Sequence, residues 1–115
     1  MDATRAIAKI QKLTEKKKTD KILKFLKTDD IDVIIAVLDA LSKIEDESSV
    51  NTIAHMIDSP EPRIRCATAK ALGVIGTEYA KTYLSLRLSK ETDETVITAI
   101  KDGLHAIADK KKAIS

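Results

Sequence analysis

The sequence predicts an all-α protein, built as a solenoid of stacked helix pairs. Three observations support this prediction: apolar residues repeat at helical spacing, turn residues are scarce, and one segment recurs at a nearly constant interval. Only three Gly and two Pro occur among 115 residues, and 3% of the residues are aromatic. β-Sandwiches and β-barrels need more turn residues and more alternating β-branched and aromatic residues. We therefore expect one helical domain over residues 1–115, long enough to bury a core.

The segment 62–77 (PRIRCATAKALGVIGT) is the clearest copy of the repeated unit. Segments 31–46 and 94–109 align with it at offsets of 31 and 32 residues. Apolar residues at such spacings form one face of a helix, and small residues mark places where helices approach closely. The aligned columns are Val33, Ile64, Val96; Ala36, Ala67, Ala99; Ala40, Ala71, Gly103; Leu41, Leu72, Leu104; and Ile44, Ile75, Ile107. This agreement predicts three stacked copies of one helix.

A shorter apolar pattern precedes each copy, at 19–28, 48–58 and 77–89. Its aligned anchors are Ile22, Ile53, Leu84 and Leu26, Ile57, Leu88. Each repeat is therefore expected to be a pair of antiparallel helices joined by a short turn. Residues 2–15 show the second-helix pattern alone, which predicts an N-terminal capping helix. The predicted divisions are the cap helix 2–15, repeats at 19–46, 48–77 and 78–109, and a frayed tail at 110–115.

The turns between paired helices share their chemistry. An acidic residue precedes each second helix, at Asp30, Glu61 and Asp93. A carboxylate in this slot meets free backbone N–H groups and the positive end of the helix dipole, which stabilises a helix by roughly 0.3–1 kcal/mol. Pro62 suits the first helical position, and Gly76 suits a left-handed residue that ends a helix.

These residues resemble HEAT repeats, in particular the short HEAT-like type also found in phycocyanobilin lyase subunits. The segment Asp58–Arg65 (DSPEPRIR), with Ala67, Ala71–Gly73 and Ile75–Gly76, is similar to the family's D-x-x-P-x-V-R-x-x-A-x-x-A-L-G-x-I-G core. The resemblance covers residues 19–109 and is strongest in the middle repeat. It implies a right-handed superhelix whose second helices line the concave side, and a role as a binding scaffold.

The middle repeat also departs from its neighbours. Arg65 holds the family's ladder position, which Ile34 and Ile97 occupy in the other copies. The resemblance therefore implies a structural role for Arg65 and no hydrogen-bonded ladder along the whole solenoid.

No constellation of catalytic residues is visible in the sequence. His55 and His105 are isolated, and neither an H-x-x-x-H pair nor a glycine-rich phosphate loop occurs. Cys66 has Arg63 and Lys70 as near neighbours, but an unreactive, half-buried thiol is the simpler interpretation. As the lone cysteine, it forms no intramolecular disulfide. The sequence therefore predicts no enzyme activity, no cofactor and no metal site.

The helix expected at 31–44 contains more apolar residues than its core face requires. Ile35 and Leu38, beside Cys66 and Ala69, are predicted to form an apolar strip on the concave side. Apolar patches with polar rims are typical of partner-binding surfaces. We therefore predict a partner protein bound along this face. The candidate residues are Ile35, Leu38, Asp39, Cys66, Ala69, Lys70, Lys101 and His105.

Charge is unevenly distributed along the chain. Residues 1–27 hold nine Lys or Arg against three acidic residues, and residues 28–62 hold one against nine. The lysine-rich N-terminal third makes nucleic acid an alternative partner. The acidic middle opposes it, and the aromatic residues Phe25, Tyr79 and Tyr83 fall on first helices, where they offer no stacking platform on the concave side. A role as an enzyme subunit, by analogy with bilin lyases, is a third alternative.

The longest purely apolar run, Val33–Leu38, is too short to span a bilayer, and the N-terminus lacks the pattern of a signal peptide. We therefore expect a cytoplasmic protein that does not enter the membrane. Terminal repeats that expose apolar faces can self-associate, so either a monomer or a homodimer is expected.

Overall fold

The computed structural model describes residues 2–114, and within them it contains helices and turns but no strand. The capping helix is α1 (Ala3–Glu15). The second helices of the three pairs are α3 (Ile31–Ile44), α5 (Pro62–Ile75) and α7 (Glu94–Ile114). The first helices are α2 (Thr19–Leu23), α4 (Val50–Ala54) and α6 (Glu78–Leu88), and α2 and α4 continue as 3₁₀ turns at Lys24–Leu26 and His55–Asp58. A further 3₁₀ turn, Glu47–Ser49, leads into α4.

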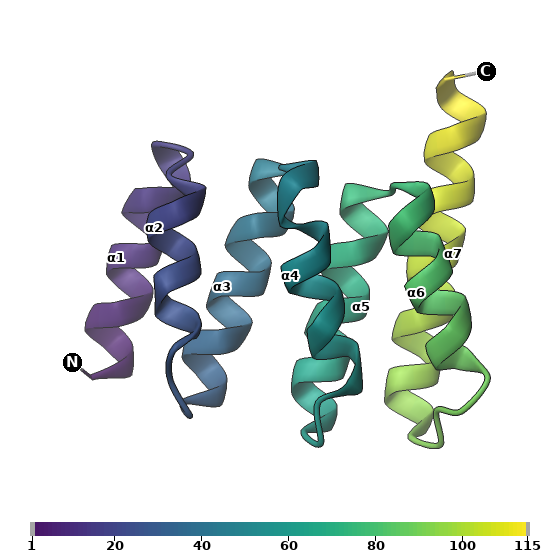
Figure 1. Ribbon diagram of the computed structural model, residues 1–115, viewed down its shortest axis with the longest axis horizontal. Helices are drawn as coiled ribbons and strands as arrows, with labels where there is room; N and C mark the ends of the chain where they lie inside the picture. The colour runs from purple at the N-terminus through teal and green to yellow at the C-terminus, as the bar shows by residue number, and fades with distance from the viewer. Residues whose placement is uncertain (1, 115) are drawn as a thin grey trace.

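The helices form two layers that follow the chain from one end of the molecule to the other (Figure 1). Helices α1, α3, α5 and α7 make one layer, and each contacts the next one along the chain. Helices α2, α4 and α6 make the other layer. The molecule measures 39 × 33 × 18 Å. This arrangement confirms the predicted all-α solenoid of helix pairs.

The core lies between the two layers and consists of the aligned apolar columns. The first-helix anchors Ile22, Ile53 and Leu84 are all fully buried. Leu41 and Leu72 of the second helices are also fully buried, whereas their counterpart Leu104 is half-buried. Within the described residues, α7 packs against α5 and α6, and no further helix of the layer covers its other side.

The acidic residues before the second helices act as N-terminal caps. The Asp30 carboxylate accepts a hydrogen bond from the Val33 N–H at 3.2 Å, and Asp93 accepts one from the Val96 N–H at 3.2 Å. Glu61 reaches the N–H of Arg63 at 3.2 Å. These bonds satisfy N–H groups that the first helical turn leaves free. The capping role predicted from the three aligned slots is confirmed.

The prediction of a frayed tail at 110–115 is wrong for residues 110–114, because α7 continues to Ile114, and Ser115 lies outside the described residues. Gly76 ends α5 with φ of 72°, and Glu45 adopts the same left-handed conformation after α3. The third copy has Ala108 in this slot, a residue that favours the helical conformation. The added turns are also anchored, since the Lys110 ammonium donates to the Ile75 carbonyl at 3.0 Å and to Glu45 at 3.3 Å.

Helices α5 and α7 approach most closely where two glycines face each other. A Cβ atom added to Gly73 would lie 2.6 Å from the Cα atom of Gly103, and one added to Gly103 would lie 2.9 Å from the Ala69 carbonyl oxygen. Real Cβ atoms do not come this close to backbone atoms. The small residue at position 103 therefore permits close helix packing, as its alignment column predicts.

The variant Gly73→Ala is expected to lower the free energy of unfolding by about 2 kcal/mol. Overpacking costs roughly 1–3 kcal/mol, and this cost cannot be relieved by a side-chain movement because the obstructing atoms belong to the backbone. The higher helix propensity of Ala returns less than about 1 kcal/mol. Urea denaturation followed by circular dichroism measures the change. Ser85→Ala on the exposed surface of α6 is the control and should be neutral or slightly stabilising. Unchanged stability of Gly73→Ala would contradict the close packing.

Candidate functional site

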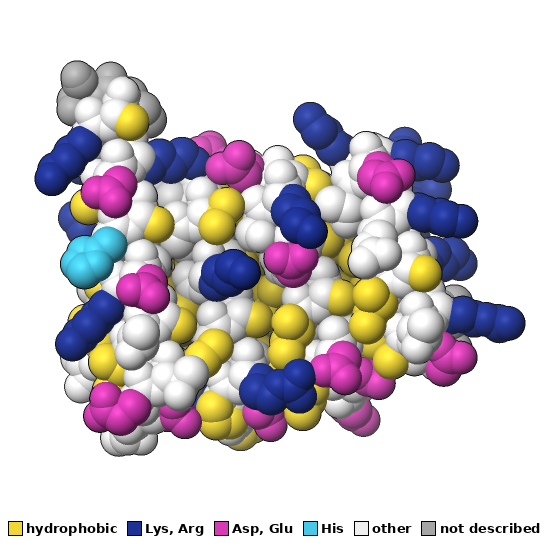
Figure 2. Space-filling view, turned by 180° about the vertical axis from the view of Figure 1, so that it is seen from behind, with side chains coloured by type: hydrophobic (Ala, Val, Ile, Leu, Met, Phe, Trp, Pro, Cys, Tyr) yellow, Lys and Arg dark blue, Asp and Glu magenta, His cyan; other side chains and the backbone are white. Residues whose placement is uncertain are grey.

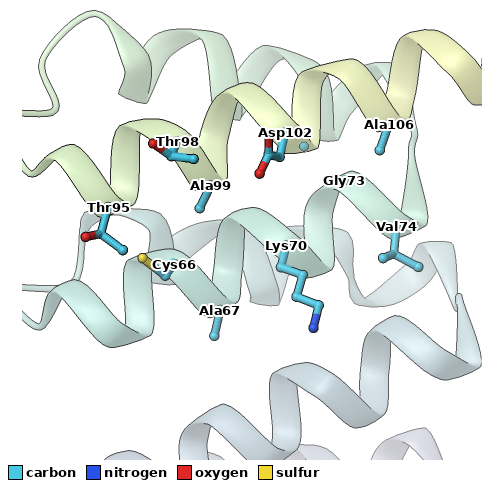
Figure 3. A pocket seen from close by; sticks show the side chains of 11 residues that line it. Cys66, Ala67, Lys70, Gly73, Val74, Thr95, Thr98, Ala99, Asp102 and Ala106 are labelled. Atoms are coloured by element: carbon cyan, nitrogen blue, oxygen red, sulfur yellow. The ribbon is translucent and has the colours of Figure 1, made fainter.

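The surface of the α1, α3, α5 and α7 layer, called here the second-helix face, shows apolar side chains between its helices (Figure 2). It contains an open groove of about 550 Å³ between α5 and α7. The groove is lined mainly by small residues, and Lys70, Asp102 and Thr98 add polar groups at its sides (Figure 3). The small lining residues are Ala67, Gly73, Ala99, Gly103 and Ala106.

The depth of this groove follows from the sequence of the two helices. The close contact at Gly73 and Gly103 holds α5 and α7 together, while the alanines beside it leave the surface without long side chains. Val74 contributes the largest apolar side chain and is 38% exposed. The result is a shallow apolar channel along the direction of the helices.

Two of the residues predicted for a surface strip are instead part of the core. Leu38 and Ala69 are both fully buried, so a partner cannot contact them. Helices α1 and α5 pack on the two sides of α3, and α3 and α7 pack on the two sides of α5. This packing covers the apolar excess of these helices. The predicted continuous strip is therefore wrong at both positions.

The other predicted residues are divided between several places. Cys66 and Lys70 line the α5–α7 groove, whereas Ile35 and Asp39 line a smaller groove of about 390 Å³ between α3 and α5. Lys70 lines this second groove as well. Lys101 and His105 are exposed on α7, and neither lines the α5–α7 groove.

The sequence interpretation missed several residues that form the groove, including Val74, Ala99, Asp102 and Ala106. One signal for them was present, because Ala99 belongs to an alignment column that is Ala in all three copies. That column indicates close packing. In the structure it also lies where two neighbouring helices leave an open channel.

The Cys66 thiol is free and half-buried. Burial raises the pKa of this thiol, the Asp93 carboxylate raises it further, and the Arg65 guanidinium opposes these effects only in part. At neutral pH the side chain is a protonated thiol. A nucleophilic cysteine needs the opposite shift. Cys66 therefore contributes apolar surface to the groove.

The buried charges of the protein meet at the loop after α6. Glu91 has a fully buried side chain, and its carboxylate accepts hydrogen bonds from Arg65 Nε at 2.9 Å, Arg65 Nη2 at 3.1 Å and Arg87 Nε at 2.9 Å. It also accepts the N–H groups of Thr92 and Asp93 at 3.2 and 3.1 Å. Burial favours the neutral acid, but the hydrogen bonds from Arg65, the Asp93 N–H and Arg87 outweigh it and lower the Glu91 pKa to about 2.

The two arginines are held from their other sides as well. Arg65 Nη1 donates to the Ser59 carbonyl at 2.8 Å, and Arg87 Nη1 donates to Asp58 at 3.0 Å. The cluster therefore joins α5, α6 and the loops before and after them. This geometry agrees with the structural role implied for Arg65. The sequence did not reveal Glu91 as its partner.

The described residues contain no group of three or more His, Cys, Asp or Glu placed to hold a metal ion. In the same part of the chain, no helix has both the length and the apolar character needed to cross a membrane.

The family described as HEAT repeats matches residues 19–105. A solved structure, the crystal structure of epoxyqueuosine reductase with an epoxyqueuosine-modified tRNA-Tyr stem loop, superimposes with a TM-score of 0.64 at 27% identity. The match covers 67% of this chain and 21% of that one, so the chain corresponds to about a fifth of its neighbour's length. The comparison with curated proteins gives no match. The family match spans most of the described helices, and the chain belongs to the HEAT-repeat family.

Proposed function

We propose that this protein is a non-catalytic scaffold whose α5–α7 groove binds the apolar face of a helix from a partner protein. The observation that supports this proposal most directly is the groove itself, an exposed apolar channel about 550 Å³ in volume and lined by small residues. HEAT-repeat solenoids present extended surfaces of this kind.

The lining favours a helix as the bound element. The alanines along the groove carry short side chains, which leaves room for a third helix to pack against α5 and α7. Amphipathic helices bind apolar grooves through residues spaced at i, i+3, i+4 and i+7. Lys70 and Asp102 on opposite sides of the groove are available to fix the direction of such a helix through complementary charges.

Site-specific photocrosslinking in the native lysate tests this proposal. A photoreactive residue at Thr98, beside the groove, is expected to capture a discrete partner protein, whereas one at the exposed position Thr52 in α4 is not. The double variant Ala99→Glu, Ala106→Glu places two carboxylates over the apolar lining and should remove the Thr98 adduct. Thermal unfolding of the double variant, followed by circular dichroism, checks that the fold is retained. The same adduct from both positions, or an adduct that survives in the folded double variant, would refute groove binding.

A further inference from the structure

The N-terminal end of the solenoid has an exposed surface on which basic side chains predominate. Figure 2 shows dark blue Lys and Arg side chains gathered along the edge of the molecule that α1 and α2 form. All nine Lys and Arg residues within positions 1–27 are exposed. This surface, called here the basic end, consists of Arg5, Lys9, Lys12, Lys16, Lys17, Lys18, Lys21, Lys24 and Lys27.

The basic residues of α1, together with Lys16 immediately after it, lie on one face of the helix. Arg5, Lys9, Lys12 and Lys16 follow one another at intervals of four, three and four residues, which returns each side chain to the same side. At 1.5 Å per residue this stripe is about 16 Å long. Lys21 and Lys24 continue the basic surface on the neighbouring α2 segment. The basic side chains of α1 and the α2 segment therefore form one continuous surface.

Within the described part of the chain, none of these nine residues forms an ion pair with an acidic group. Elsewhere several basic side chains are paired with acidic groups, as in Lys43 with Asp39 and Lys111 with Glu78. The Asp2 carboxylate at the basic end is engaged in capping α1, where it accepts the Arg5 N–H at 2.9 Å. A terminal helix of a solenoid needs a polar outer surface, but a mixture of both signs would serve that purpose without mutual repulsion.

We propose that the basic end binds the phosphate backbone of a nucleic-acid stem loop. Lysine side chains contact phosphates as point charges and release condensed counterions. The one aromatic residue of this end, Phe25, packs against the core and offers no stacking platform for bases. Binding therefore depends on charge and duplex geometry, without a preferred sequence.

The structural neighbour favours nucleic acid over other polyanions. That protein was crystallised with a tRNA stem loop, and it superimposes on 67% of this chain. An anionic membrane surface or an acidic protein would offer charge as well, and the experiment includes the membrane as a separate arm. The proposal does not depend on the α5–α7 groove, which lies between later helices of the same layer.

Fluorescence anisotropy with a labelled RNA stem loop and a DNA hairpin of the same sequence tests this proposal. With four phosphate contacts along α1, the affinity for either hairpin is expected to fall about 100-fold between 50 and 200 mM salt, since the log–log slope is roughly −0.9 per contact. The variant Arg5→Gln, Lys9→Gln, Lys12→Gln, Lys16→Gln should reduce the magnitude of this slope by roughly 0.9 for each contact removed, which eliminates most of it. The matched control Lys43→Gln, Lys81→Gln, Lys90→Gln, Lys101→Gln removes the same charge from other exposed surfaces and should retain the slope.

Three results would overturn the proposal. The first is equal loss of binding in the stripe variant and its control, which indicates attraction by net charge alone. The second is an affinity that does not change with salt. The third is binding to vesicles of phosphatidylserine and phosphatidylcholine without binding to either hairpin, which assigns the basic end to a membrane surface. Both variants are expected to fold, because all eight replaced side chains are exposed. Circular dichroism checks this expectation.

Discussion

Replacement of Arg65 by alanine is expected to lower the free energy of unfolding by about 3–5 kcal/mol. The change removes two hydrogen bonds from Glu91 and one from the Ser59 carbonyl. The Glu91 side chain is fully buried, so its carboxylate would remain in the interior with Arg87 as its remaining charged partner. Loss of one member of a buried ion pair is costly because the other charge stays desolvated. Urea denaturation followed by circular dichroism measures the loss.

Arg63 provides a control two residues earlier in the same helix. It pairs with Asp32 at 2.7 Å, but the two side chains are 60% and 61% exposed. Exposed pairs contribute about 0–1 kcal/mol, so Arg63→Ala should change stability by less than about 1 kcal/mol. Similar losses in both variants would show that the Arg65 cluster has no special role in stability.

The second large effect is a loss of stability in acid that depends on Glu91. Its pKa falls from an ordinary value of 4.5 to about 2 in the folded protein. A lowered folded-state pKa stabilises the protein above the unfolded-state value, and this contribution is lost as the pH falls from about 5 towards 2. A shift of this size corresponds to about 3 kcal/mol. Urea denaturation at a series of pH values measures the loss.

The variant Glu91→Gln separates this residue from the other carboxylates. It should be less stable than the parent at pH 7, because a neutral amide replaces the charge that Arg65 and Arg87 surround. Between pH 5 and 2 its stability should change less steeply, by about one proton in the linkage slope. Identical pH profiles for the parent and this variant would show that Glu91 titrates normally.

The helix pairs could be predicted because each repeat carries apolar residues at the same helical positions. Residues such as Leu41 and Leu72 occupy the same helical face in successive copies, and both are fully buried. The caps at Asp30 and Asp93 were predicted for the same reason, since a carboxylate before a helix acts on N–H groups only a few residues away. Such features depend on residues that are close together in the sequence, so they can be predicted without the tertiary structure.

The binding surface could not be predicted as well. Leu38 and Ala69 belong to apolar faces that look exposed in a single helix, yet both are fully buried. Their burial depends on how closely the helices on each side approach. Glu91 was missed because it lies in a loop without an aligned counterpart, so no column identifies it as the partner of Arg65.

The sequence by itself therefore determined the all-α class, the helix pairs, the caps and the uneven charge, because these depend on periodicity, composition and contacts close along the chain. Only the tertiary structure decided which apolar residues remain exposed, where the α5–α7 groove lies and which acid pairs with Arg65. Those features arise where separate helices meet. They depend on how closely the helices pack, as at the contact between Gly73 and Gly103.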